Sequence, residues 1–117
     1  MTAENSHTLT WDDFTKVDMR VGKVTKAEPF PAARKPAMKL WIDFGPTLGT
    51  RKTSAQITQR YTPESMVGRK VVAVVNFPPK QIADFMSEVL VLGAEDENGH
   101  IALLAPEKDT PLGKKIY

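Results

Sequence analysis

Apolar and polar residues alternate along several stretches of the chain, as they do in β-strands with one buried face. The clearest alternation runs through residues 38–44, where Leu40, Ile42 and Phe44 are separated by polar or amphipathic residues. Because successive side chains of a strand point to opposite faces, these three apolar residues are predicted to face one core. Residues 19–30 alternate in a similar way and predict another strand.

Two further stretches are almost continuously apolar. Residues 69–77 and 88–94 are rich in valine and leucine, which predicts strands buried on both faces. Gly22, inside the strand predicted at 19–30, indicates a bend or a bulge. Further extended segments are predicted at residues 51–58, 99–106 and 110–117.

Two short helices are indicated by their start signals. Thr10 is a candidate N-cap for a helical turn in residues 10–18, and Asp13 stands three residues later. Thr62 is a candidate N-cap for a second helix, over residues 62–68, which ends at a glycine.

Many short strands, turns rich in glycine and proline, and one small helix between the third and fourth strands favour a mainly β fold. We predict one domain over residues 1–117, with residues 1–10 as a flexible N-terminal segment. The order of elements is that of a five-stranded OB-fold barrel with short helices and extra C-terminal strands. In that fold the loops between strands 1 and 2 and between strands 4 and 5 hold the ligand. Here those loops are residues 30–37 and 76–84.

The composition is that of an ordinary globular protein, with 41% hydrophobic and 26% charged residues among 117. The chain has no cysteine, which excludes disulfides and thiol chemistry. The N-terminal residues are polar and do not resemble a signal peptide, and no apolar run approaches the roughly 20 residues that span a bilayer. These features predict a cytoplasmic protein.

Charge is distributed unevenly along the chain. Residues 16–80 contain 13 lysines and arginines against four acids, whereas residues 81–113 contain seven acids against Lys108 alone. The basic block is a candidate surface for a polyanion. The alternative is that its lysines only protect strand edges and keep the protein soluble.

Four stretches, "VDMRVGKV", "QRYTPESMVGRKVVAVVNFPPK", "SEVLVLGA" and "IALLAPE", resemble the tRNA-binding OB domain. That domain is appended to methionyl-tRNA synthetases, begins the phenylalanyl synthetase β-chain, and also occurs as free dimeric proteins. The resemblance extends to a free-standing bacterial branch of the family, which acts as an export-associated chaperone. It therefore implies a homodimer that binds unfolded or precursor polypeptides, with export machinery and tRNA as further candidate partners.

The family's RNA-binding motif is matched in part. Asn76, Pro79 and Lys80 match the loop after the fourth strand, and Ser87 and Glu88 match the fifth strand. The loop's two prolines would stiffen it, so that its polar groups are presented at little entropic cost. The candidate RNA-binding residues are Arg34, Lys35, Lys39, Arg51, Lys52, Asn76, Lys80 and Ser87.

The chain also departs from that motif. Gln81 stands where RNA-binding relatives have a lysine, and Val89 and Leu90 stand where they have Gly-Met. One lysine fewer implies about one phosphate contact fewer, and therefore a lower affinity for RNA that depends less on salt.

Apolar residues near the two loops suggest a different ligand, because methionine and aromatic side chains make surfaces that accept varied peptides. Part of this set has an alternative role in core or subunit packing. Trp11 and Phe14, one turn apart, are the candidate dimer interface. The candidate peptide-binding residues are Phe30, Met38, Trp41, Phe77, Phe85 and Met86.

Catalysis is not indicated. His7 and His100 stand in no metal-binding or acid–base spacing, and the chain has no glycine-rich phosphate loop. We therefore expect no catalytic residue, no metal and no cofactor. The favoured function is a non-enzymatic chaperone for unfolded or pre-export polypeptides, and the alternative is a structure-specific tRNA-binding protein.

Overall fold

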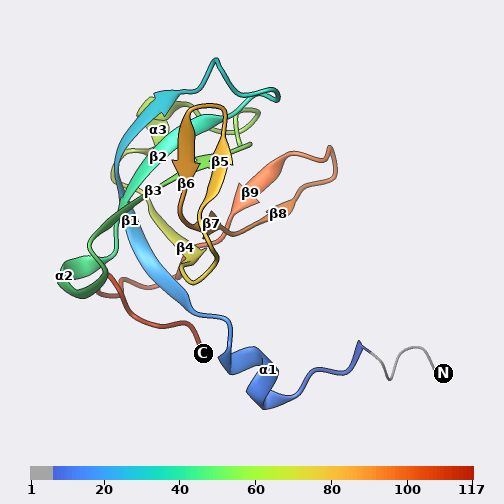
Figure 1. The fold of residues 1–117 in the computed structure, drawn as a ribbon, viewed down its shortest axis with the longest axis vertical. Coiled ribbons are helices and arrows are strands. Elements are labelled where there is room, and N and C mark those ends of the chain that lie inside the picture. The colour runs from blue at the N-terminus through green and yellow to red at the C-terminus, as the bar shows by residue number, and fades with distance from the viewer. Residues whose placement is uncertain (1–6) are drawn as a thin grey trace.

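Five antiparallel strands of the computed structural model, which describes residues 7–117, form one sheet that curls into a nearly closed barrel (Figure 1). The strand order is β3-β2-β1-β4-β7, and two hairpins, β5–β6 and β8–β9, lie outside this sheet. The prediction of a mainly β, OB-like barrel with short helices is confirmed. The elements are α1 (Trp11–Thr15), β1 (Met19–Pro29), β2 (Met38–Asp43), α2 (Gly45–Leu48), β3 (Thr50–Ala55), α3 (Pro63–Met66), β4 (Lys70–Val74), β5 (Lys80–Ile82), β6 (Phe85–Ser87), β7 (Leu90–Val91), β8 (Gly93–Glu95) and β9 (Ile101–Leu103).

The barrel core follows the predicted alternation. Leu40, Ile42 and Phe44 are buried, and so is Met38, which has the same parity along β2. Residues 71–75, in and just after β4, are buried on both faces as predicted. One continuous cluster of buried side chains therefore fills the barrel.

Gly22 has a different role from the predicted bend. The irregularity in β1 lies further along, between Val24 and Lys26. At Gly22 a Cβ atom would stand 2.5 Å from the Ile42 side chain and 2.7 Å from the Phe44 ring. The glycine is needed because side chains in and just after β2 pack directly against the β1 backbone.

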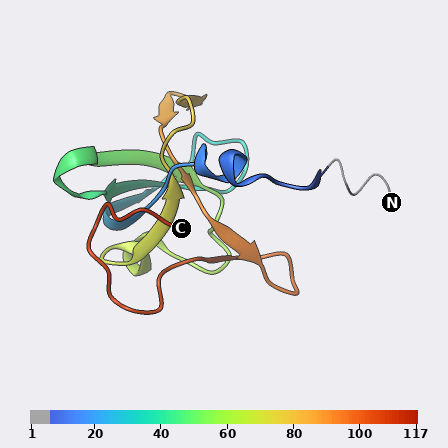
Figure 2. The ribbon, with the colours of Figure 1, turned by 90° about the horizontal axis from the view of Figure 1, so that it is seen from below.

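The apolar run at residues 88–94 is divided, which corrects the prediction of one strand. β7 ends at Val91 and a new strand, β8, pairs with β9 in a hairpin that projects from the barrel (Figures 1 and 2). Tyr61 Oη accepts a hydrogen bond from the Leu103 amide at 2.9 Å, and Arg60 pairs with Asp96 at 2.8 Å. These contacts tie the hairpin to the loop after β3.

The helices α1 and α3 begin where the sequence predicts, whereas α2 was not predicted. Thr10 accepts a hydrogen bond from the Asp13 amide at 3.1 Å, and Thr62 accepts one from the Ser65 amide at 3.2 Å. Residues 1–6 lie outside the described residues, so the prediction of a flexible N-terminal segment stays a prediction. Across residues 7–117, no helix has both the length and the apolar character that a membrane span requires.

Candidate nucleic-acid and polypeptide grooves

Three of the predicted cations meet in one groove. The loop between β1 and β2 contributes Arg34 and Lys35, and β5 contributes Lys80 from the opposite side. Ser54 and Gln56 also line this space, which has a volume of about 600 Å³. Within the described chain no Asp or Glu lines it. We call it the basic groove. Its lining mixes small apolar residues with three cations, whose positive charge suits a phosphate backbone.

Two more predicted cations, Lys39 and Lys52, lie on the outer face of the barrel among aromatic residues. We call this group the aromatic–lysine cluster, and its members are Lys26, Phe30, Lys39, Trp41, Lys52 and Phe85. Lys26 and Lys52 flank Trp41 on the neighbouring strands. The Lys26 ammonium stands 4.6 Å from the Trp41 ring centre, and the Lys52 ammonium stands 5.2 Å from that of Phe85. Such cation–π contacts hold positive charge against the β1–β3 surface.

Phe85 is the centre of this cluster. Its ring packs edge-on against Phe30 at 5.5 Å and against Trp41 at 5.9 Å, and the Lys39 ammonium lies 5.1 Å away. Phe30 and Phe85 are buried, whereas Trp41 is half-buried. The cluster therefore fixes the β5–β6 hairpin on the sheet and leaves part of one aromatic ring accessible.

A second groove, with a volume of about 640 Å³, is mainly apolar. Phe77, 54% exposed, and Leu90, 49% exposed, stand at its surface. We call it the apolar groove. Its lining residues are Ser54, Ala55, Gln56, Ile57, Phe77, Pro78, Lys80, Ile82, Ser87, Glu88, Val89, Leu90, Val91, Leu92, Gly93 and Ile101.

The predicted peptide-binding residues do not gather in one place. Phe77 lines the apolar groove, and Met86 is exposed on β6 opposite Gln81. Met38 lies in the barrel core, and Phe30 and Phe85 are buried in the aromatic–lysine cluster. The expectation that these last three offer a peptide-binding surface is therefore corrected, because their side chains are already packed within the chain.

The apolar groove is also lined by residues outside the predicted peptide-binding set, among them Leu90, Val91, Leu92 and Ile101. Adjacent strand residues point to opposite faces, and at residues 89 and 90 only one of the two faces is covered, unlike at residues 71–75. Val89 is 5% exposed and Leu90 is 49% exposed.

Ser87 and Glu88 close the barrel by bonding to the edge of β3. Glu88 Oε1 accepts from the Lys52 amide at 2.9 Å, while the Glu88 amide donates to the Lys52 carbonyl at 2.8 Å. Ser87 Oγ accepts from the Ser54 amide at 3.2 Å and lies 2.7 Å from Thr53 Oγ1. We call this junction between residues 52–54 and residues 87–89 the barrel seam. The Ser87 hydroxyl, predicted to contact RNA, thus takes part in it.

Two other residues predicted to contact RNA also make hydrogen bonds within the molecule. Arg51 Nε donates to the Leu48 carbonyl of α2 at 3.3 Å, and the Asn76 side chain bonds to the segment between α1 and β1. Among the described residues that line the two grooves, neither Arg51 nor Asn76 appears. The Asn76 amide and the Arg51 Nε thus take part in the fold, and their contact with RNA stays a prediction.

The candidate dimer residues lie on α1. The Trp11 and Phe14 rings are 5.5 Å apart, and Trp11 is 71% exposed. None of the five residues of α1 is buried. The helix therefore presents an apolar pair to its surroundings.

The acidic residues form no evident metal site in the described part of the chain, where no group of three or more His, Cys, Asp or Glu could hold an ion. Asp96 instead makes a turn by accepting from the His100 amide at 3.0 Å and the Asn98 amide at 2.8 Å. These hydrogen bonds, with the Arg60 ion pair, hold the pKa of Asp96 below its ordinary value against the opposing effect of burial.

Residues 19–115 match the model of the tRNA-binding domain family, tRNA_bind. The methionine–tRNA ligases of Methanococcus aeolicus and Deinococcus radiodurans are 40% and 37% identical over 105 and 114 residues. These matches cover 90% and 97% of this chain but 15% and 16% of the ligases. The chain thus spans about a sixth of the length of these relatives.

Solved structures of similar length also match. The chaperone CsaA of Bacillus anthracis is 53% identical with a TM-score of 0.88, and the match covers 94% of this chain and 99% of that one. The CsaA chaperone protein of Picrophilus torridus is 49% identical with a TM-score of 0.87, covering 94% and 100%. The methionyl-tRNA-synthetase-related protein of Pyrococcus horikoshii is 32% identical with a TM-score of 0.83, covering 94% and 98%. The chain therefore belongs to the tRNA-binding domain family and is a CsaA-like member of it.

Proposed function

We propose that the protein is a non-enzymatic chaperone that holds unfolded or pre-export polypeptides in the apolar groove. The observation that carries this proposal is the groove itself. Two large apolar side chains in its lining, Phe77 and Leu90, are about half exposed. Contiguous exposed apolar surface in a small domain marks a binding site more often than chance. The likeness over 94% of the chain to two proteins described as CsaA chaperones supports the same function.

The groove suits ligands of varied sequence. Its lining combines aliphatic and aromatic side chains with polar residues that include Ser54, Gln56 and Glu88. Apolar burial is not directional, so different side chains can fill the same space. The protein would act in the cytoplasm, before a client chain folds or is exported.

The test of this function is a titration of the native protein with a permanently unfolded polypeptide, at low and at high salt. We expect saturable binding that salt changes little, because apolar burial is not screened by ions. A natively folded form of the same polypeptide serves as the control and should not bind. Absence of binding to the unfolded form would refute the chaperone function.

A second function, binding of tRNA, is favoured by the basic groove. Arg34, Lys35 and Lys80 converge there from segments far apart in the sequence, and Lys39 and Lys52 add charge on the adjoining surface. The match to the tRNA-binding domain family supports this candidate. Gln81, where relatives carry a lysine, also lines the groove, so we expect fewer phosphate contacts than in those relatives.

Replacing Lys80 with alanine should weaken tRNA binding and reduce its salt dependence. Each phosphate neutralised on a single strand contributes about −0.7 to the slope of log affinity against log salt. Loss of one contact should flatten the slope by about that amount. Lys108→Ala, which removes an exposed lysine outside both grooves, is the matched control and should leave the slope unchanged. An unaltered slope in Lys80→Ala would contradict a phosphate contact at this residue.

We also propose a homodimer formed through α1. Sedimentation of the native protein should give about twice the chain mass of 13.0 kDa, because Trp11 and Phe14 form an apolar pair with little cover from their own chain. Trp11→Ser should shift the equilibrium towards monomer, whereas Val67→Ser, at an exposed apolar residue after α3, should not. A native protein that remains monomeric at every concentration would contradict the dimer.

A further inference from the structure

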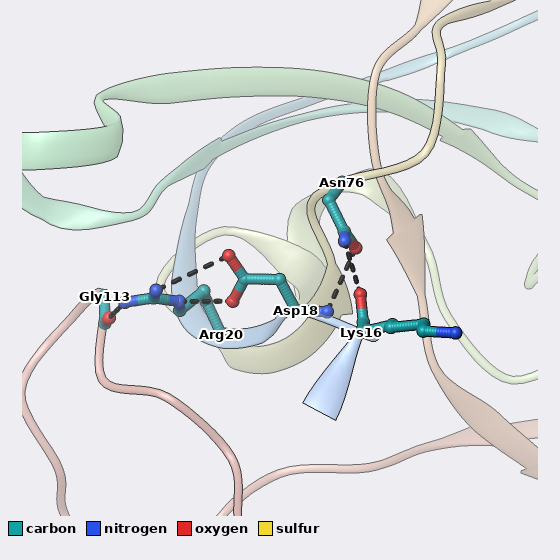
Figure 3. A network of polar contacts seen from close by, with 5 residues as sticks. All are labelled: Lys16, Asp18, Arg20, Asn76 and Gly113. Carbon is teal, nitrogen blue, oxygen red and sulfur yellow. Dashed lines mark hydrogen bonds and ion pairs between the residues drawn. The ribbon is translucent and has the colours of Figure 1, made fainter. Parts of the chain in front are cut away.

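Asn76 connects the loop after β4 to the linker between α1 and β1, residues 16–18 (Figure 3). Its Nδ2 donates to the Lys16 carbonyl at 2.7 Å, and its Oδ1 accepts from the Asp18 amide at 3.0 Å. The neighbouring Val75 amide donates to the Asp18 carbonyl at 2.8 Å. One side-chain amide and one backbone amide thus hold the two ends of the linker.

The same linker is held from its other side by the C-terminal segment. Arg20 forms a fork with the Asp18 carboxylate, at 2.6 Å from Nε and 3.4 Å from the second nitrogen. Its remaining nitrogen donates to the Gly113 carbonyl at 2.9 Å (Figure 3). The hydrogen bond with Asp18 raises the pKa of Arg20 above its ordinary value. Asp18 is therefore fixed at its carboxylate by Arg20 and at its backbone by residues 75 and 76.

These bonds matter for α1 because the helix has little other support. None of its residues is buried, and Lys16, the residue whose carbonyl Asn76 binds, is the C-cap of the helix. A five-residue helix is too short to be stable by itself. Its direction relative to the barrel is thus set where the chain leaves it, at the carbonyl of Lys16.

We propose that Asn76 is a positioning residue that orients α1, and with it the surface formed by Trp11 and Phe14, against the barrel. Its role is internal, and it does not contact RNA. The consequence for assembly rests on the homodimer proposed above, whereas the orientation of α1 does not. An asparagine suits this position because its amide supplies a donor and an acceptor together, and the linker presents one carbonyl and one N–H to it.

The proposal is tested by amide hydrogen exchange in Asn76→Ala, Asn76→Asp and the control Asn98→Ala. Asn98 is an exposed asparagine in the β8–β9 turn. In Asn76→Ala the Asp18 amide loses its acceptor and should exchange about tenfold faster, the equivalent of one hydrogen bond. The amides of β4 report whether the barrel stays folded and should be unchanged, as should every amide of the linker in Asn98→Ala.

Asn76→Asp separates the two hydrogen bonds. The carboxylate keeps the acceptor for the Asp18 amide but cannot donate to the Lys16 carbonyl. Because this donor is missing at neutral pH, the mobility of the Trp11 indole should rise in the variant. Protonation of the carboxylate restores a donor, so the mobility should return towards the native value as the pH falls through the pKa of the carboxyl group. Asp13 in the α1 cap and Asp18 in the pair with Arg20 also face this segment, so the variant is compared with the native protein at each pH, and the difference between the two should close as the pH falls. A Trp11 signal that stays native in Asn76→Asp at every pH would overturn the proposal.

Sedimentation and RNA titration of the same variants complete the test. If Asn76 only positions α1, then Asn76→Ala should dimerise more weakly and keep the native RNA affinity and salt slope. Native exchange at Asp18 together with lost RNA affinity would show that Asn76 is a ligand contact instead, and would overturn the proposal. If the native protein proves monomeric, the homodimer fails, and the exchange of Asp18 still decides the role of Asn76.

Discussion

Replacing Phe77 with alanine should lower the affinity for an unfolded polypeptide by roughly 5- to 150-fold, about 1 to 3 kcal/mol. The Phe77 ring is 54% exposed and lines the apolar groove, so a bound chain would remove much of its remaining apolar surface from water. The free protein gains little stability from a ring that is already half exposed. The loss should therefore appear in binding and hardly at all in unfolding.

The control for this experiment is Leu104→Ala. Leu104 is 46% exposed, and among the described residues it lines neither groove. It should bind the polypeptide as the native protein does. Competition measurements with one fluorescent unfolded chain would compare the three proteins directly, and equal affinity in Phe77→Ala and the native protein would remove Phe77 from the site.

Thr53→Val should reduce the free energy of unfolding by about 1 to 3 kcal/mol. Thr53 is 1% exposed, and its Oγ1 donates to the Val89 carbonyl at 2.7 Å and lies 2.7 Å from Ser87 Oγ. Valine has nearly the same shape but no hydroxyl. The Val89 carbonyl, at a buried residue, would lose this hydrogen bond, and the half-buried Ser87 hydroxyl would keep only its bond from the Ser54 amide. A buried carbonyl without its partner is costly to desolvate.

Urea unfolding of Thr53→Val and of Thr50→Val gives the comparison. Thr50 is an exposed residue on the same strand. Replacing it with valine therefore measures the effect of the different strand propensities of threonine and valine, without any loss of a hydrogen bond in the barrel seam. We expect a clear shift of the midpoint for Thr53→Val and almost none for Thr50→Val. Equal midpoints would mean that the seam is not held by this hydroxyl.

Local signals in the sequence were sufficient for much of the fold. The cap at Thr10 and the alternation at residues 38–44 each reflect contacts within a few residues, and both predictions are confirmed. The division of residues 88–94 depends on a distant contact. At Gly93 a Cβ atom would stand 2.5 Å from the Ile101 side chain, and composition alone does not show that β9 packs there.

The candidate site was less predictable, for two different reasons. Asn76 and Ser87 carry groups that bond equally well to a ligand or to the backbone, and their sequence positions do not show which partner is near. Met38 is different, because it shares its parity with Leu40 and Ile42, and a stricter use of the two-residue period would have placed it in the core. The gathering of Arg34 with Lys80 followed from the expected fold, which brings the two loops to one end of the barrel.

Ser54, Gln56, Lys80 and Ile82 line both the basic groove and the apolar groove. A polypeptide filling one groove and an RNA filling the other would meet at this common wall and compete for Lys80. Linkage then requires that each ligand weaken the other by the same factor. A protein of this design would release RNA when a client chain arrives, and the cellular ratio of unfolded protein to free tRNA would decide which of the two it carries.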